Sequence, residues 1–136
     1  MNYAAINSFI GKPWIYREND CWAVFRKAAK SVFGIQVDEV EIPEHPDFEH
    51  NKELFKNEIG REYWRLTDTP TGGCAAFFYD KRGNVVHIGL YVDNGDILHC
   101  NGQPEKGGST TFDNVKILSR LYGKIEYYEY IPNNDC

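Results

Sequence analysis

Residues 16–34 read YRENDCWAVFRKAAKSVFG, and this stretch decides how the first part of the chain folds. Apolar residues recur there every three or four positions, a spacing that predicts a single buried stripe on an α-helix. Asn19 and Asp20 are both favourable N-cap residues, and Gly34 is a favourable C-cap residue. We therefore predict a helix that starts near Asp20, with Cys21 in its first turn.

Two further helices are expected around this one. A short helix is predicted over residues 3–10, ending at Gly11 before a Lys-Pro pair. Residues 37–50 carry two prolines and many acidic side chains, which indicates an irregular surface connection. A helix over residues 47–58, with Asp47 as its candidate cap, is predicted to follow.

The second half of the chain has the alternation and turn signals of β-strands. The run GGST at 107–110 is predicted to be a mobile loop rather than a phosphate cradle, because no helix start follows it. Helices first and strands afterwards favour an α+β domain with an antiparallel sheet. The five predicted strands are 74–80, 85–92, 96–100, 114–119 and 124–131.

Composition limits the classes of function. The 136 residues suit a single domain, 1–136, and 15 basic against 20 acidic residues give a net charge of −5 without any basic run. Nucleic acid is therefore not an expected partner. Neither a signal peptide nor a membrane-spanning stretch is evident, so no membrane partner is expected. The four cysteines form no C-x-x-C pair and are expected to be reduced, with Cys74 and Cys100 as packing residues.

Cys21 has two readings. The unpaired N–H groups of a helix start, together with the helix dipole, favour an anion, so a thiol there is expected to have a lowered pKa and to act as a nucleophile. The same N–H groups could bind the oxyanion that forms when sulfur attacks a carbonyl. The alternative is a buried, inert cysteine, which is common in proteins.

Two histidines, twelve residues apart on neighbouring strands, favour the catalytic reading. With a two-residue Asn-Gly turn, His87 and His99 would lie on opposite faces of their hairpin. A three-residue loop at 93–95 pairs Gly89 with His99 instead, and both histidines then share a face at a diagonal spacing of about 7–8 Å. The strand residues permit both registers, and we predict the three-residue loop.

This register gives each residue a role. His87 would accept the Cys21 proton and later protonate the leaving amine, while His99 would fix the orientation and tautomer of His87. A metal site of His87, His99 and Cys100 is the weaker alternative, since adjacent strand residues point to opposite faces. No cofactor and no metal are expected, because acyl transfer through sulfur needs neither.

The segments GKPW, NDCWAVFRKAAKSVFGI and HIGLYVDNGDILH resemble the NlpC family of papain-like cysteine peptidases, bacterial and phage enzymes that cut peptidoglycan stem peptides. The form with tryptophan after the cysteine is similar to versions in phage tail proteins. The resemblance covers about residues 8–102, with a gap through the acidic connection. It implies a papain-like fold, with N-terminal helices packed on the five-stranded antiparallel sheet, and a triad of Cys21, His87 and His99.

Some positions depart from the family pattern. The family's Gly-Asp before the first strand is Gly73-Cys74 here, and its substrate-contacting tyrosine is Trp14, with Tyr16 nearby as a substitute. These changes bear on the substrate pocket and leave the triad intact. The predicted substrate-binding residues are Trp14, Tyr16, Asp20 and Trp22, with Tyr91 added because it shares the histidine face.

The resemblance therefore implies a cysteine peptidase or amidase that acts on peptidoglycan peptides, most plausibly within a phage tail. Such a protein would be made in the cytoplasm and assembled into the virion, in contact with other tail proteins. A different class of function is also open, because the same domain could be a catalytically silent structural or assembly module of a tail tip.

Overall fold

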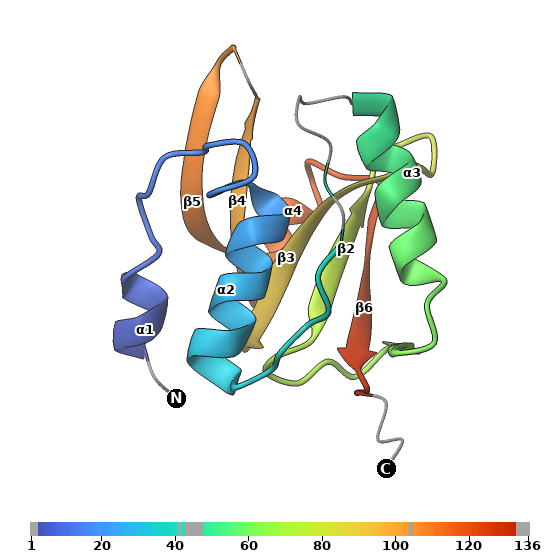
Figure 1. Ribbon diagram of the computed structural model, residues 1–136, viewed down its shortest axis with the longest axis horizontal. Coiled ribbons are helices and arrows are strands. Elements are labelled where there is room, and N and C mark those ends of the chain that lie inside the picture. Colours follow the sequence, from blue (N-terminus) through green and yellow to red (C-terminus); the bar gives the residue numbers. More distant parts are fainter. Residues whose placement is uncertain (1–2, 41, 43–47, 104, 133–136) are drawn as a thin grey trace.

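The structure is a computed structural model that describes residues 3–40, 42, 48–103 and 105–132, with the backbone alone for residues 48–51. Four helices and six strands follow one another along the described chain (Figure 1). The helices are α1 (Tyr3–Asn7), α2 (Cys21–Phe33), α3 (Phe48–Ile59) and α4 (Val115–Leu118). The strands are β1 (Trp64–Thr67), β2 (Ala75–Tyr79), β3 (Val85–Asp93), β4 (Asp96–Gln103), β5 (Gly107–Asn114) and β6 (Lys124–Tyr130).

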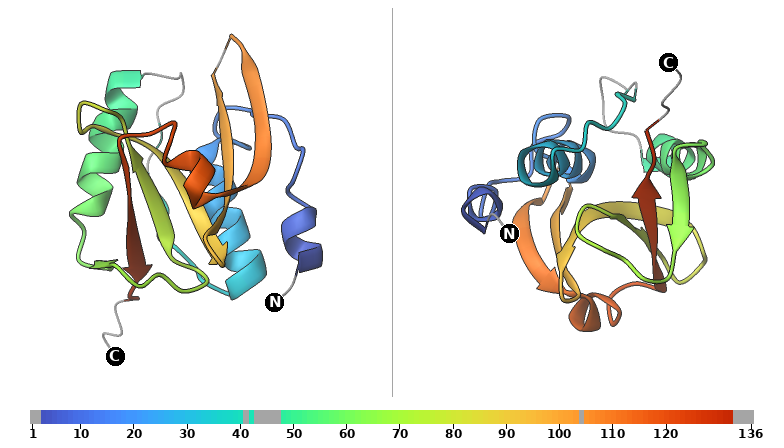
Figure 2. Two further views of the ribbon diagram at one scale, coloured as in Figure 1. Left: turned by 180° about the vertical axis from the view of Figure 1, so that it is seen from behind. Right: turned by 90° about the horizontal axis from the view of Figure 1, so that it is seen from below.

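The strands form one sheet in the order β1-β6-β2-β3-β4-β5, and each neighbouring pair is antiparallel. In the view from below, the sheet is curved, and α4 lies on the side of the sheet away from α2 and α3 (Figure 2). The β4–β5 hairpin extends away from β3 towards the top of Figure 1. This separation of β3 from β4 creates the space in which the site is built.

The predicted papain-like fold, with N-terminal helices on a five-stranded sheet, is wrong. The sheet has six strands and the helices are few and short, the longest being α2 with 13 residues. Only α2, of the two N-terminal helices, packs closely on the sheet, because α1 lies mainly against α2. The other helix on that face, α3, comes from the middle of the chain.

The errors lie in three segments. β1 was not predicted, since four residues give too short an alternating pattern. The predicted loop at 107–110 belongs to β5, where two glycines hide the strand signal. The predicted strand at 114–119 is largely α4, because the side chain of Asn114 accepts a hydrogen bond from the N–H of Lys116 and starts a helical turn.

The helix predicted from residues 16–34 is confirmed. The Asp20 side chain accepts a hydrogen bond from the N–H of Ala23, and Gly34 ends the helix at φ 68°, in the left-handed region. The Asp47 cap predicted for the next helix lies outside the described residues. The apolar stripe of α2 is buried, so burial on the sheet holds Cys21 at a fixed place.

Apolar side chains form two clusters, one on each face of the sheet. The larger cluster joins α2 and α3 to the strands and contains Phe25, Phe55 and Phe77. The smaller cluster lies on the other face and contains Phe78, Ile97 and Leu118, with Tyr122 packed against it. Alternate residues of a strand thus serve different clusters, as the strand period of two requires.

The segment before α2 is fixed to the edge of the sheet. Pro13 forms a bridge with Ser109 of β5, and the N–H of Trp14 donates to the carbonyl of Gly108 over 2.9 Å. A side chain at Gly102 would overlap the Trp14 side chain, so the indole lies directly on the β4 backbone. Trp14 is therefore held beside the end of β4.

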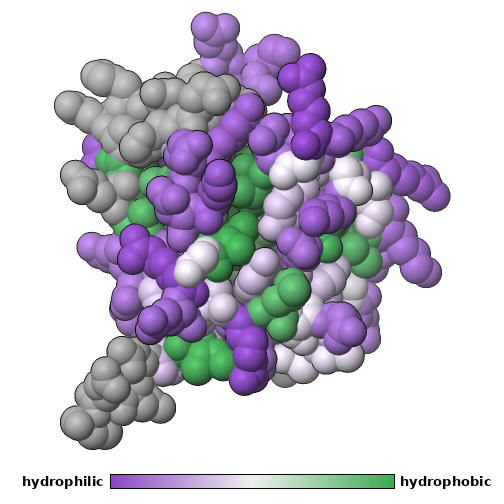
Figure 3. Space-filling view, turned by 90° about the vertical axis from the view of Figure 1, so that its right-hand side faces the viewer, coloured by the Kyte–Doolittle hydropathy of each residue, from purple (hydrophilic) through white to green (hydrophobic). Residues whose placement is uncertain are grey.

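The face over α3 and the β1–β6 edge is dominated by polar side chains, with apolar ones in separate patches (Figure 3). Leu66 of β1 is among the exposed apolar residues. Within the described part of the chain, no helix combines the length and apolar character needed to cross a membrane.

Replacing Gly108 by alanine is expected to destabilise the β4–β5 hairpin. Gly108 has φ 152°, and a Cβ there would overlap the carbonyl oxygen of Asn101. The free energy of unfolding in urea should fall by about 2 kcal/mol or more. The control is Gly107→Ala, at φ 69° with nothing near its Cβ, for which strain alone predicts a loss of about 1 kcal/mol. Equal losses for the two variants would contradict this account.

Candidate active site

The register of β3 against β4 places both histidines on one face. Leu90 pairs with Leu98, which sets Gly89 opposite His99. The turn itself differs from the prediction, because Asp93 pairs with Asp96 across a two-residue turn. An irregularity between Tyr91 and Asp93 adds one residue to β3 and restores the predicted pairing. The three-residue loop was therefore wrong and the shared face right.

The absence of a side chain at Gly89 lets the two histidines meet. A Cβ at that position would lie 2.6 Å from the Ile97 side chain and 3.0 Å from the Cβ of His99. The Nε2 atom of His87 is 2.9 Å from Nδ1 of His99, and both side chains are buried. The predicted contact between His87 and His99 is therefore present.

The chain of contacts continues to a residue that the sequence reasoning missed. Nε2 of His99 lies 2.9 Å from Oδ2 of Asp113, and the hydroxyl of Thr111 donates to the same oxygen over 2.6 Å. His99 pairs with Thr111 in the β4–β5 ladder. Asp113 lies between the predicted loop 107–110 and the predicted strand 114–119. Pairing of β5 with β4 places it two residues from Thr111, on the face of His99.

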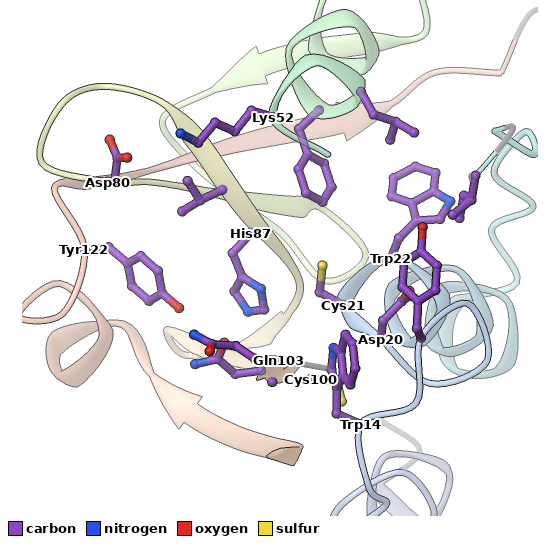
Figure 4. Close-up of a pocket in the computed structure, with 17 residues that line it drawn as sticks. Trp14, Asp20, Cys21, Trp22, Lys52, Asp80, His87, Cys100, Gln103 and Tyr122 are labelled. Carbon is purple, nitrogen blue, oxygen red and sulfur yellow. The ribbon is translucent and has the colours of Figure 1, made fainter. Parts of the chain in front are cut away.

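Cys21 and His87 project into one pocket of about 600 Å³ from different elements (Figure 4). The lining includes Val86 with its neighbour His87, and Cys100 with its neighbour Asn101. Adjacent strand residues point to opposite faces, so the pocket joins the two faces of the sheet. It can do so because the β3–β4 pairing ends at Leu90, whereas β4 remains paired with β5 as far as Gln103.

The thiol of Cys21 is held neutral in this structure. Cys21 is the first residue of α2, as predicted, but burial and the nearby charge of Asp20 raise its pKa to about 12. Hydrogen bonds from the backbone N–H groups of Ile88 and Trp22 act in the opposite direction and are outweighed. The prediction of a lowered thiol pKa was therefore wrong, because desolvation exceeds the effect of the helix start.

His87 is also neutral and is packed between aromatic rings. The ring of Tyr122 stacks on it at 6.0 Å with an interplanar angle of 4°, and Phe78 lies at 4.9 Å. Burial is the main cause that lowers the pKa of His87 well below its ordinary value, and repulsion between the two rings when both are protonated acts in the same direction. Tyr122 comes from the segment between α4 and β6, so no sequence spacing linked it to the site.

The predicted substrate residues divide into two groups. Trp14, Tyr16, Asp20 and Trp22 all line the pocket, and the rings of Trp14 and Tyr16 lie 6.3 Å apart. Both carboxylate oxygens of Asp20 accept backbone N–H groups, from Arg17 and Ala23, so this carboxylate has a structural role already. Tyr91 is directed elsewhere, since its hydroxyl accepts the N–H of Gly95 and its ring packs on Tyr127.

The described residues offer no cluster of three histidine, cysteine or carboxylate side chains suited to a metal ion. The Cys100 thiol donates to the carbonyl of Asn19 over 2.9 Å rather than turning towards His99. Cys21, Cys74 and Cys100 are free thiols, and Cys136 lies outside the described residues. The metal site of His87, His99 and Cys100 thus gains no support from the geometry.

Comparison with known proteins finds no family model that matches the chain and no curated protein that matches its sequence. The evidence for the site is therefore its own geometry, together with the motifs quoted above.

Replacing Asp20 by asparagine is expected to make Cys21 more reactive. Asparagine is an equally good cap residue whose oxygen can keep the hydrogen bond from the N–H of Ala23, and it removes the charge that raises the thiol pKa. The rate of iodoacetamide alkylation at pH 8, followed by peptide mass spectrometry with Cys21→Ser as background, should increase severalfold. Glu18→Gln is the matched control for a lost carboxylate. An unchanged rate in Asp20→Asn would contradict the assigned electrostatics.

Replacing Tyr122 by alanine is expected to raise the pKa of His87 towards its ordinary value. Burial is the main reason for the low pKa, and the stacked ring supplies part of that burial. Tyr122→Phe keeps the ring and should leave the pKa low. Titration of the imidazole signals by NMR measures both variants. A pKa of His87 that stays equally low in Tyr122→Ala would show that the ring does not shield it.

Proposed function

We propose that this protein is a cysteine peptidase or amidase that hydrolyses amide bonds in peptidoglycan stem peptides, as part of a phage tail. The proposal combines the resemblance to the NlpC family with the chemistry of the pocket. Cys21 is the proposed nucleophile, His87 the base and His99 the residue that orients the base.

One observation carries the proposal. His87 lines the same pocket as Cys21, and its Nε2 is 2.9 Å from Nδ1 of His99. Among the described residues, this leaves Nδ1 of His87 as the ring nitrogen available to a reacting partner. A buried histidine with a single ring nitrogen left for a reacting partner is suited to general-base catalysis. Its low pKa keeps it neutral and able to accept a proton at pH 7.

The first step is attack on the amide. The thiol proton of Cys21 moves to Nδ1 of His87 while sulfur bonds to the carbonyl carbon, and the carbonyl oxygen becomes an oxyanion. Backbone N–H groups at the start of α2 are suited to stabilise that charge. Thiol and imidazole are both neutral at rest, so proton transfer accompanies the attack of sulfur on the carbonyl carbon and no thiolate–imidazolium pair has to exist beforehand.

The second half of the reaction regenerates the thiol. The protonated His87 gives its proton to the leaving amine as the carbon–nitrogen bond breaks, which leaves a thioester on Cys21. Water then attacks the thioester, with His87 again accepting a proton. The acid is released and the thiol is restored, without cofactor or metal.

The walls of the pocket are consistent with a peptide substrate. Trp14 and Tyr16 supply aromatic surface on one side. Asn101 and Gln103 at the end of β4 supply amide groups that can bind a peptide backbone. Lys52 and Asp80 add charges of both signs, and stem peptides carry both free carboxylates and free amines.

A second function is favoured by one observation. A thiol pKa of about 12 is far above that of most catalytic cysteines, which suits a silent structural or assembly module of a tail tip. The two proposals differ in whether the protein turns over substrate on its own.

Digestion of purified sacculi discriminates between them. Wild-type protein is expected to release soluble muropeptides, detected by mass spectrometry, and Cys21→Ala should release none because the nucleophile is lost. Cys74→Ala is the matched control, since Cys74 is another free thiol but is buried and does not line the pocket.

Two outcomes would contradict the hydrolase proposal. Equal release by wild type and Cys21→Ala would exclude Cys21 as the nucleophile. Failure of the folded wild-type protein to release any fragment would favour the structural module.

A further inference from the structure

We infer that Asp113 is a positioning residue that fixes the tautomers of His99 and His87, and thereby presents an unprotonated Nδ1 of His87 to Cys21. The consequence for catalysis rests on the proposed function, whereas the tautomers themselves can be measured without it. Asp113 contacts neither Cys21 nor the pocket, so it would act through the two histidines.

The argument begins at the carboxylate, which can only accept hydrogen bonds. Burial by itself would raise the pKa of Asp113, but the hydrogen bonds from Thr111 and His99 prevail and lower it, so the group is ionised at neutral pH. Its Oδ2 lies 2.9 Å from Nε2 of His99, a distance that requires a hydrogen between them. Nε2 of His99 therefore carries a proton.

The protonation of His87 follows from the neutrality of His99. Burial lowers the pKa of His99, and the bond to Asp113 offsets this only in part, so the ring is neutral at pH 7. A neutral imidazole protonated at Nε2 has a lone pair at Nδ1. Nδ1 lies 2.9 Å from Nε2 of His87, which must therefore donate. Since His87 is neutral too, its Nδ1 is left without a proton.

The reversed pair of tautomers is unfavourable where His99 meets Asp113. If His99 donated from Nδ1 to His87, its Nε2 lone pair would face a carboxylate oxygen 2.9 Å away. Two acceptors at that distance repel each other, and the His99 ring is buried, so little bulk water reaches its Nε2. His87 would then carry its proton on Nδ1 and could not accept the thiol proton.

Neighbouring side chains hold the rings and the carboxylate of this hydrogen-bond series in place. Tyr122 and Phe78 pack against the His87 ring, which restricts its rotation. Thr111 donates to the same Asp113 oxygen and orients it. Asp113 is 36 % exposed on its side chain, so its replacement need not disrupt the core.

The test measures the tautomers directly. In wild-type protein labelled with ¹⁵N, histidine long-range correlation spectra should show the proton on Nε2 and none on Nδ1 for both rings. Asp113→Ala removes the acceptor, and Asp113→Asn offers either a donor or an acceptor, so both variants should give mixed tautomers. Asp113→Glu keeps a carboxylate and should recover the wild-type pattern in part. Asp93→Asn, near the turn of the hairpin, is the control for a lost carboxylate.

The kinetic expectation is a loss in kcat with little change in KM. Asp113→Ala should lower kcat for muropeptide release by roughly 10²-fold, the lower end of what a general base contributes. A wild-type His87 protonated at Nδ1, or unchanged tautomers in Asp113→Ala, would overturn the inference. If wild type releases nothing but the tautomers shift as described, the proposed function fails while the positioning role of Asp113 stands.

Discussion

The register of β3 against β4, set by the pairing of Leu90 with Leu98, is the constraint on which the site depends. A strand alternates its side chains between two faces, so a slip of one residue would move His99 away from His87. The extra residue of β3 beside Val92 sets this register, and the bare backbone of Gly89 leaves room for the contact. A feature of the turn thus determines whether the two histidines meet.

In the pocket, burial affects the pKa values of the titratable side chains more than the nearby hydrogen-bond donors do. The helix start and two backbone N–H groups favour a thiolate at Cys21, yet desolvation and Asp20 keep the thiol protonated. The same desolvation keeps both histidines neutral. The resting site therefore contains a neutral thiol and a neutral base, and the only charge in its hydrogen-bond chain lies at Asp113.

The parts of the site that follow from short-range patterns could be predicted. Periodicity and caps placed Cys21 at a helix start, and strand parity brought His87 and His99 together, although a bulge and not a longer loop produced that parity. Asp113 and Tyr122 could not be found in this way, because their contacts depend on where β5 and the segment after α4 lie in space. The sheet itself was misjudged where glycines conceal β5 and where Asn114 starts a helical turn within an apolar run.

The neutral state of the Cys21 thiol affects how readily its sulfur is oxidised. Peroxides and disulfides react with thiolates, and with a pKa of about 12 the thiolate fraction at pH 7 is on the order of one in 10⁵. The sulfur would therefore be oxidised only slowly in the absence of substrate. In an oxidising medium without reducing agents, such a cysteine would therefore remain a free thiol for longer than one with an ordinary pKa.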